Sequence, residues 1–80
     1  MPFELFKDVI LTADFPEEGL KAGDIGTVVD HHVVPGIEDG YTVEFFDMAG
    51  DTVAVVTVRE SLLRRPSRMD RPSVRVMAGT

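Results

Sequence analysis

Apolar and polar residues alternate over short stretches of this chain, and glycine or proline separates one stretch from the next. In the clearest stretch, residues 41–47, the side chains of Tyr41, Val43 and Phe45 fall on one face. A period of two is typical of a β-strand with one buried side. Three other runs, rich in β-branched residues, predict further strands. They span residues 5–12, 25–34 and 52–58.

Two of these runs also predict which side chains share a face. Because successive side chains of a strand point to opposite faces, each run divides into two sets. In the first run Val9 and Leu11 are expected to face the core, which leaves Ile10 on the outer side. In the second run alternate residues from Ile25 to Val29 share one face.

The breaks between the runs have the composition of turns. Pro16 and Gly23 fall in the polar stretch 13–24, and Gly50 falls in the sequence "MAGD". Proline fixes φ and glycine adopts backbone conformations that other residues resist, so a hairpin turn with positive φ is predicted at Gly50. Leu20 stands alone in its polar stretch, and we expect it to hold this loop against the core.

Four or five short strands, with no sustained helical period, predict an all-β fold, a small antiparallel barrel of about five strands. A chain of 80 residues has room for one such domain. We place the barrel at residues 1–65, with a short helical turn and a brief last strand at its end. Residues 66–80 are predicted to form an extended basic tail.

Four motifs follow one another in a characteristic order. They are "DVIL" at 8–11, "PEEGLKAGDIGTV" at 16–28, "YTVEFFD" at 41–47, and a Val/Thr-rich segment beginning "GDT" at 50–58. This order resembles a family of small bacterial proteins that is classed only as a domain of unknown function. The resemblance covers residues 8–64, and the tail departs from the family pattern.

The resemblance implies an SH3-like barrel that acts by binding. The block "GDIGTV" is also similar to the first corner of ribosomal KOW segments, the nitrile hydratase β-subunit and small photosynthetic electron-transfer subunits, which share such barrels. Genes of the resembled family lie beside genes for other small uncharacterised proteins. This arrangement implies a toxin–antitoxin or immunity-like pair.

The glycines at 23 and 26 have two interpretations. A phosphate-binding loop places backbone N–H groups at the start of a helix, whereas a β-run follows Gly26 here, and Asp24 would repel phosphate. In a barrel corner, Gly23 permits the turn and Gly26 allows neighbouring strands to approach closely. We adopt the barrel corner.

Groups suited to catalysis or metal binding are sparse in this sequence. There is no cysteine, which excludes disulfides and thiolate metal sites. His31 and His32 are the two histidines, and neighbouring strand residues point to opposite faces, so they are not expected to share one ion. The alternative is a metal site with Asp30 or Glu38. We predict no enzymatic activity, no metal and no cofactor.

Charge is divided unevenly along the chain, whose net charge is −6. Residues 1–58 carry 12 acids and two lysines, whereas residues 59–80 carry six arginines and two acids. The acidic part should repel phosphate backbones, which argues against nucleic acid as a partner. Several acids cluster in 14–24, which is either a solvated loop or a docking surface for a basic protein.

The N-terminal segment contains Glu4 and no long apolar stretch, so it does not have the character of a signal peptide. No run of residues approaches the roughly 20 apolar residues that cross a membrane. The absence of cysteine also suits a reducing compartment. We therefore expect a cytoplasmic protein that does not bind membranes.

Phe46 breaks the alternation of its strand, and Val53, Val55 and Val56 make the next strand apolar on both faces. Either a bulge or the tail covers these residues, or they form an exposed stripe for a partner or a second copy. The tail has three interpretations. It is a solubilising segment, a segment that docks on an acidic surface of its own or another chain, or a nucleic-acid contact.

These observations favour a non-catalytic protein-binding module, the neutralising member of a small bacterial gene pair. The expected partner is a basic protein, which the acidic body would mask, and a homodimer through the tail or an exposed strand is compatible with this role. The alternatives are a nucleic-acid accessory that uses the arginine-rich tail and a structural subunit of an enzyme complex. The candidate partner-binding residues are Asp14, Glu17, Glu18, Asp24, Tyr41, Glu44, Phe46, Arg64 and Arg65.

Overall fold

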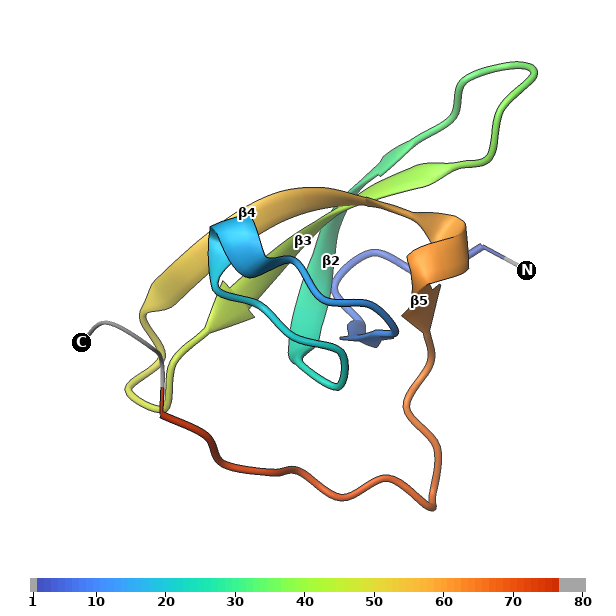
Figure 1. The fold of residues 1–80 in the computed structure, drawn as a ribbon. Helices are drawn as coiled ribbons and strands as arrows, with labels where there is room; N and C mark the ends of the chain where they lie inside the picture. The colour runs from blue at the N-terminus through green and yellow to red at the C-terminus, as the bar shows by residue number, and fades with distance from the viewer. Residues whose placement is uncertain (1, 77–80) are drawn as a thin grey trace.

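Five strands form one antiparallel sheet in a computed structural model, which describes residues 2–76 (Figure 1). Their order across the sheet is β4-β3-β2-β1-β5, so the last strand returns to pair with the first. The sheet curls into a half-barrel, and residues 2–76 contain no α-helix. The predicted all-β fold with five antiparallel strands is confirmed. The elements are β1 (Asp8–Leu11), η1 (Pro16–Glu18), β2 (Ile25–His32), β3 (Gly40–Phe46), β4 (Thr52–Arg59), η2 (Glu60–Leu62) and β5 (Leu63–Arg64).

One cluster of buried apolar side chains lies on the inner face of the sheet. Tyr41, Val43 and Phe45 all belong to it, as their alternation predicts. Leu20 is also buried in this cluster, which confirms that it holds its loop against the core. Burying a side chain of this size contributes about 1.5–3 kcal/mol. The remaining members are Val9, Leu11, Val28, Val58 and Leu63.

The structure corrects the expectation for Ile10. Its side chain is 3% exposed, although it lies outside the core cluster to which Val9 and Leu11 belong. β1 lies between β2 and β5, and Ile10 is directly opposite Ile25 and Arg64 on these strands. Residues that oppose each other on antiparallel strands share a face, so these neighbours cover Ile10 from both sides. A period of two assigns a face but does not show whether that face is covered.

Gly26 lies where three strands meet. It pairs with Val9 on β1 and with Phe45 on β3. A Cβ at this position would lie 2.5 Å from Cγ1 of Val43 and 2.9 Å from two ring carbons of Phe45. Real Cβ atoms do not approach other atoms this closely. The absence of a side chain therefore allows the buried residues of β3 to pack directly over β2, as the barrel-corner interpretation requires.

Gly50 and Gly23 are two of the four glycines in residues 2–76 that have a positive φ. Gly50 has φ 88° in the β3–β4 turn, which confirms the hairpin predicted there, and the turn is closed by Asp47 N donating to Asp51 O at 2.9 Å. Gly23 has φ 97° at the end of the loop that leads into β2. Most residues with a side chain are strained at such φ values.

The chain leaves the sheet after β5, which the short turn η2 precedes as predicted. Residues 66–76, which we call the strap, contain no strand and run in an extended path back past the body of the molecule (Figure 1). Residues 77–80 of the predicted tail lie outside the described residues. Within residues 2–76, none of the helical segments has the length and apolar character needed to cross a membrane.

The close approach at Gly26 generates a stability prediction. Gly26→Ala is expected to lower the free energy of unfolding by about 1–3 kcal/mol, because the added methyl must displace two buried side chains. Gly40→Ala is the matched control, since a Cβ there would meet its nearest atom at 3.6 Å, an ordinary contact. Urea denaturation compares the two variants. Equal stability of both would show that the packing over Gly26 has no energetic importance.

Candidate functional site

The acidic loop, residues 14–24, is fixed to the body by backbone hydrogen bonds. Leu11 N donates to Asp24 O at 2.9 Å, and Gly23 N donates to Leu11 O at 2.8 Å, which ties the end of the loop to β1. Phe15 and Leu20 exchange two backbone hydrogen bonds of 2.9 and 3.1 Å around η1. With Leu20 also buried in the core, the loop presents its acidic groups in fixed positions.

Two carboxylates of this loop are oriented by its own backbone. Asp24 Oδ2 accepts a hydrogen bond from Lys21 N at 2.9 Å, and Asp14 Oδ1 accepts one from Ala22 N at 2.9 Å. Gly19 ends η1 with φ 72°, and its carbonyl oxygen bonds to the same arginine side chain as Asp24. We call Asp14, Gly19 and Asp24 the cradle.

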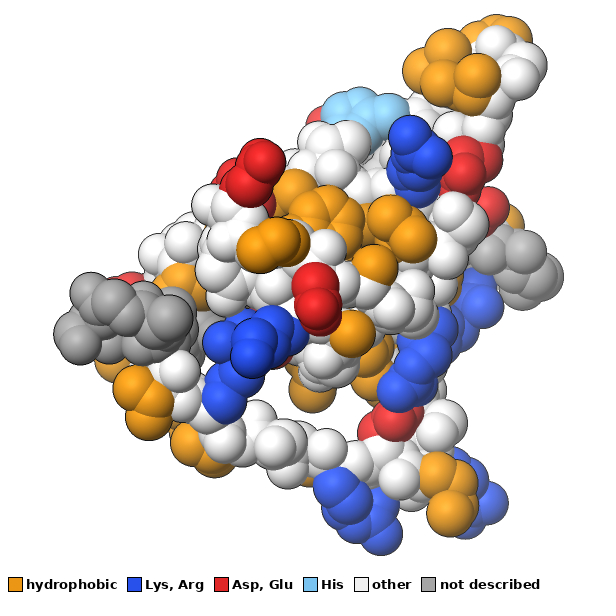
Figure 2. Space-filling model, in the orientation of Figure 1, with side chains coloured by type: hydrophobic (Ala, Val, Ile, Leu, Met, Phe, Trp, Pro, Cys, Tyr) orange, Lys and Arg blue, Asp and Glu red, His pale blue; other side chains and the backbone are white. Residues whose placement is uncertain are grey.

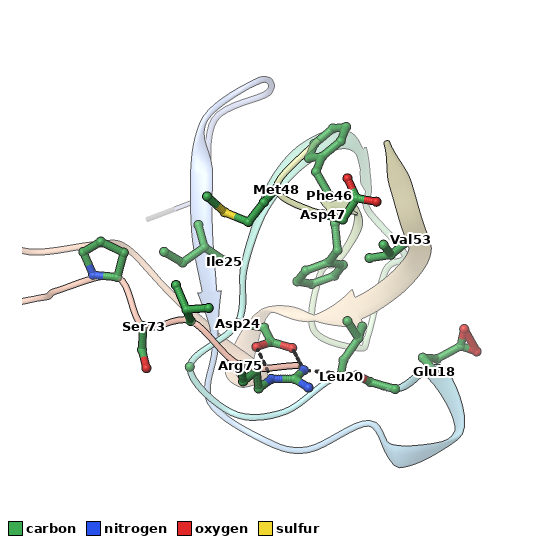
Figure 3. A pocket seen from close by; sticks show the side chains of 15 residues that line it. Glu18, Leu20, Asp24, Ile25, Phe46, Asp47, Met48, Val53, Ser73 and Arg75 are labelled. Carbon is green, nitrogen blue, oxygen red and sulfur yellow. Dashed lines mark hydrogen bonds and ion pairs between the residues drawn. The ribbon is translucent and has the colours of Figure 1, made fainter. Parts of the chain in front are cut away.

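Arg75 of the strap binds in the cradle (Figure 3). Its Nε donates to Asp24 Oδ1 at 3.2 Å, and its Nη2 donates to Asp24 Oδ2 at 2.5 Å and to Gly19 O at 3.1 Å. The hydrogen bonds and charge of Asp24, with the charge of Asp14, raise the pKa of Arg75. A planar guanidinium fits a carboxylate through two parallel bonds. The cradle is therefore a site for a guanidinium group.

A groove of about 390 Å³ lies between the cradle, the β3–β4 turn and the strap. Apart from the strap, its walls include four apolar side chains that stay partly or largely exposed, among them Ile25 at 44% and Phe46 at 45%. Met48 and Val53 are the other two (Figure 3). An apolar wall beside a charged site is the composition expected of a binding groove.

The strap is anchored near its start by a second ion pair. Arg64 donates through both Nη atoms to Asp70, at 2.7 and 2.9 Å, and Ser67 N donates to Asp70 Oδ2 at 2.6 Å. The Arg64 guanidinium and then the Ser67 N–H hold the pKa of Asp70 well below its usual range. Figure 2 shows an opening between the strap and the rest of the molecule. The strap is thus held at two points, by Asp70 and by Arg75.

The predicted site residues of the acidic loop have different positions in the structure. Asp14 and Asp24 belong to the cradle. Glu17 and Glu18 lie in η1 and are exposed, and Glu18 also lines the groove. Glu18 and Asp24 therefore line the groove, Asp14 belongs to the cradle alone, and Glu17 belongs to neither.

Tyr41 is completely buried, so the interpretation of this residue as part of a binding face does not fit its position. Its hydroxyl donates to Glu60 Oε1 at 3.3 Å and accepts from Phe3 N at 3.1 Å. The ring stacks on His31 with a centroid separation of 4.5 Å. Burial, together with the carboxylates of Glu60 and Asp39, raises the pKa of Tyr41. This tyrosine joins three segments of the chain inside the domain.

Phe46 follows the buried Phe45 and therefore points to the outer face of β3, where it lines the groove. The register of β3 and β4 shifts at the same point, between Phe45 and Phe46. Glu44, the predicted site residue two positions before Phe46, accepts a hydrogen bond from the Thr52 hydroxyl across the β3–β4 pair. The bulge does not cover Phe46, which lines the groove and stays 45% exposed, and Val55 on β4 is exposed as well. The use of this stripe by a partner or a second copy stays a prediction.

The remaining predicted site residues, Arg64 and Arg65, hold parts of the chain together. Arg64 pairs with Asp70 as described above. Arg65 donates to Pro2 O at 2.9 Å, and its guanidinium carbon lies 5.1 Å from the centre of the Phe3 ring. A cation over an aromatic face is an attractive contact. These arginines thus connect β5 to the strap and to the N-terminal segment.

The two histidines have separate partners. His31 Nε2 lies 2.8 Å from Asp39 Oδ2, and His32 Nε2 lies 2.8 Å from the Thr42 hydroxyl. In the part of the chain that the structure describes, no three His, Asp or Glu side chains gather as a metal site would require.

Sequence reasoning identified the acids of the cradle but not the group that binds there. Nothing in the sequence distinguishes Arg75 from the other arginines of the tail, and the carbonyl of Gly19 carries no signal in a sequence. The division of charge between the body and the tail was the available signal. Of the three interpretations of the tail, docking on the chain's own acidic surface is the one that the structure shows for Arg75.

Comparison with known proteins assigns most of the chain to one family. Residues 5–65 match the family described as Domain of unknown function (DUF4926). The chain belongs to this family. The resemblance to a family of unknown function is thus confirmed, and no curated protein or solved structure gives a significant match. The DUF4926 region contains the cradle residues and ends at Arg65, before the strap.

The anchor between Arg64 and Asp70 generates a pH prediction. The carboxyl group of Asp70 should titrate below the usual pKa of about 3.9. A depressed folded-state pKa means that the contact contributes to stability above the ordinary pKa and is lost as the pH falls through the folded value. NMR titration of the Asp70 carboxyl carbon measures this midpoint.

Arg64→Gln should raise the Asp70 midpoint toward its usual value, because the largest cause of the shift is removed. Arg65→Gln is the matched control, since the contacts described for Arg65 are with Pro2 and Phe3. An Asp70 midpoint that is the same in wild type and Arg64→Gln would contradict the anchor.

Proposed function

We propose that this chain is a non-catalytic module that binds a basic protein through the cradle and the adjoining groove. One observation carries the proposal: the cradle already holds a guanidinium group, with two bonds to Asp24 and one to Gly19. An arginine of another protein presents the same group. The negative charge of the acidic body would also attract a basic partner and speed its association.

The fixed position of the acidic loop supports a binding role. Association costs less free energy when the binding groups are already ordered. Asp14 and Asp24 are held by backbone N–H groups, and the loop itself is tied to β1 and to the core through Leu20. The cradle is therefore prepared for a partner and does not need to be assembled on binding.

Nucleic acid has less support as a partner than a basic protein. Phosphate contacts require arginines that can turn toward a backbone. Arg64 and Arg75 instead form bidentate contacts with Asp70 and Asp24. The acidic cradle lies beside the tail and would repel phosphate.

The finer role that we propose is neutralisation of a basic partner in the cytoplasm, as the antitoxin- or immunity-like member of a gene pair. A toxin that acts on nucleic acid depends on exposed arginines, and an acidic surface that binds these arginines would mask them. The absence of cysteine is compatible with a reducing compartment.

Affinity capture from a lysate of the native host tests this function. The full chain should retain one basic protein in stoichiometric amount, and Asp24→Asn should reduce the retained amount at least about tenfold, as for the loss of a charged hydrogen-bonded pair. Asparagine keeps an oxygen for the Lys21 N–H, so the loop is expected to stay folded.

Asp51→Asn is the matched control for this experiment. It removes one acid from the β3–β4 turn, outside the cradle and the groove. Equal retention by both variants would show that binding does not use the cradle. Retention that disappears on nuclease treatment would instead support the nucleic-acid alternative.

A further inference from the structure

The strap fills only part of the site that it covers. Arg75 occupies the cradle, but the side chain of Val74 is 83% exposed, although it borders the groove. Phe46, Ile25 and Met48 remain accessible along the same groove. The chain's own tail thus satisfies the charged part of the site and leaves the apolar part unfilled (Figure 3).

The neighbouring groups define the chemistry of a better occupant. A guanidinium matches the carboxylate of Asp24 and the carbonyl of Gly19, whereas the compact ammonium of lysine makes no planar pair. The exposed side chains of Phe46 and Ile25 favour an occupant that carries an aliphatic or aromatic residue close to its guanidinium group. The extended path of the strap shows that an extended chain reaches the cradle (Figure 1).

We propose that the groove recognises an extended peptide segment in which an arginine lies next to large apolar residues, and that this segment displaces the strap. The inference rests on the proposed function and specifies which part of the basic partner is bound. The displaced Arg75 is the competitor of the partner's arginine. Because the tail is covalently attached, it competes at a high effective concentration.

Two features make the strap displaceable. Its hydrogen bonds to the cradle come from the single side chain of Arg75, and no strand pairing holds residues 66–76. The anchor at Asp70 uses a different arginine, Arg64, and lies five positions before Arg75 in the chain. Release of Arg75 can therefore leave the Arg64–Asp70 contact intact.

Peptide binding to the full chain tests the inference. The probe is a fluorescein-labelled peptide with one arginine between two leucines, in a Gly/Ser background, and fluorescence anisotropy measures its affinity. Arg75→Gln should bind this probe about tenfold more tightly than wild type, as expected if the strap occupies the cradle in roughly nine molecules of ten. Addition of Asp24→Asn to Arg75→Gln should abolish the gain.

Matched probes separate the two parts of the site. On the Arg75→Gln chain, glutamine or lysine in place of the probe arginine should weaken binding about tenfold or more, because the paired charged hydrogen bonds are lost. Serine in place of both leucines should also weaken binding, and Phe46→Ser should reduce the affinity for the leucine probe alone. NMR spectra confirm that each variant is folded.

Three results would overturn the inference. They are equal binding of the arginine and glutamine probes, equal affinity of wild type and Arg75→Gln for the arginine probe, and probe affinity that falls with protein concentration as a dimer forms. The last result would assign the groove to the tail of a second copy.

If host-lysate capture still depends on Asp24 when the arginine probe does not bind, this inference fails and the proposed function survives. If capture is independent of Asp24 although the probe binds, the proposed function fails.

Discussion

The close packing at Gly26 is the constraint on which the rest of this structure depends. β2 pairs with β1 on one side and β3 on the other, and the missing Cβ lets Val43 and Phe45 pack directly over it. A domain of this size has a single small core, so a displaced pair of core side chains cannot be compensated elsewhere. The same strand begins at Ile25 in the wall of the groove, and the packing at Gly26 therefore also positions the candidate site.

The binding surface depends on the core through the acidic loop. Leu20 lies inside the core, and Gly19 immediately precedes it with a left-handed backbone that directs its carbonyl to Arg75. Asp24 closes the loop by bonding to the backbone of Lys21 and of Leu11. The site for arginine is therefore built from a core contact and local backbone bonds, and it does not depend on the strap being in place.

The fold followed from the sequence because its signals are local. The alternation at Tyr41, Val43 and Phe45 and the glycine at position 50 each depend on neighbouring residues, and both predictions are confirmed. The candidate site was only partly accessible from the sequence, because it depends on distant contacts. No local pattern pairs Arg75 with Asp24, which lie 51 positions apart in the chain. Nor does any local pattern show that the hydroxyl of Tyr41 binds Phe3 and Glu60 inside the domain.

The strength of the strap contacts determines what kind of surface this is. Ion pairs between exposed side chains contribute little to stability, because water competes for both groups and salt screens their attraction. The strap is held by two pairs that water still partly reaches, Arg64–Asp70 and Arg75–Asp24, whereas the sheet is held by backbone ladders and a buried core. The strap can therefore open without unfolding the sheet. A rigid acidic cradle covered by a weakly held basic segment can exchange that segment for a better ligand, whereas a tail packed into the core could not be exchanged.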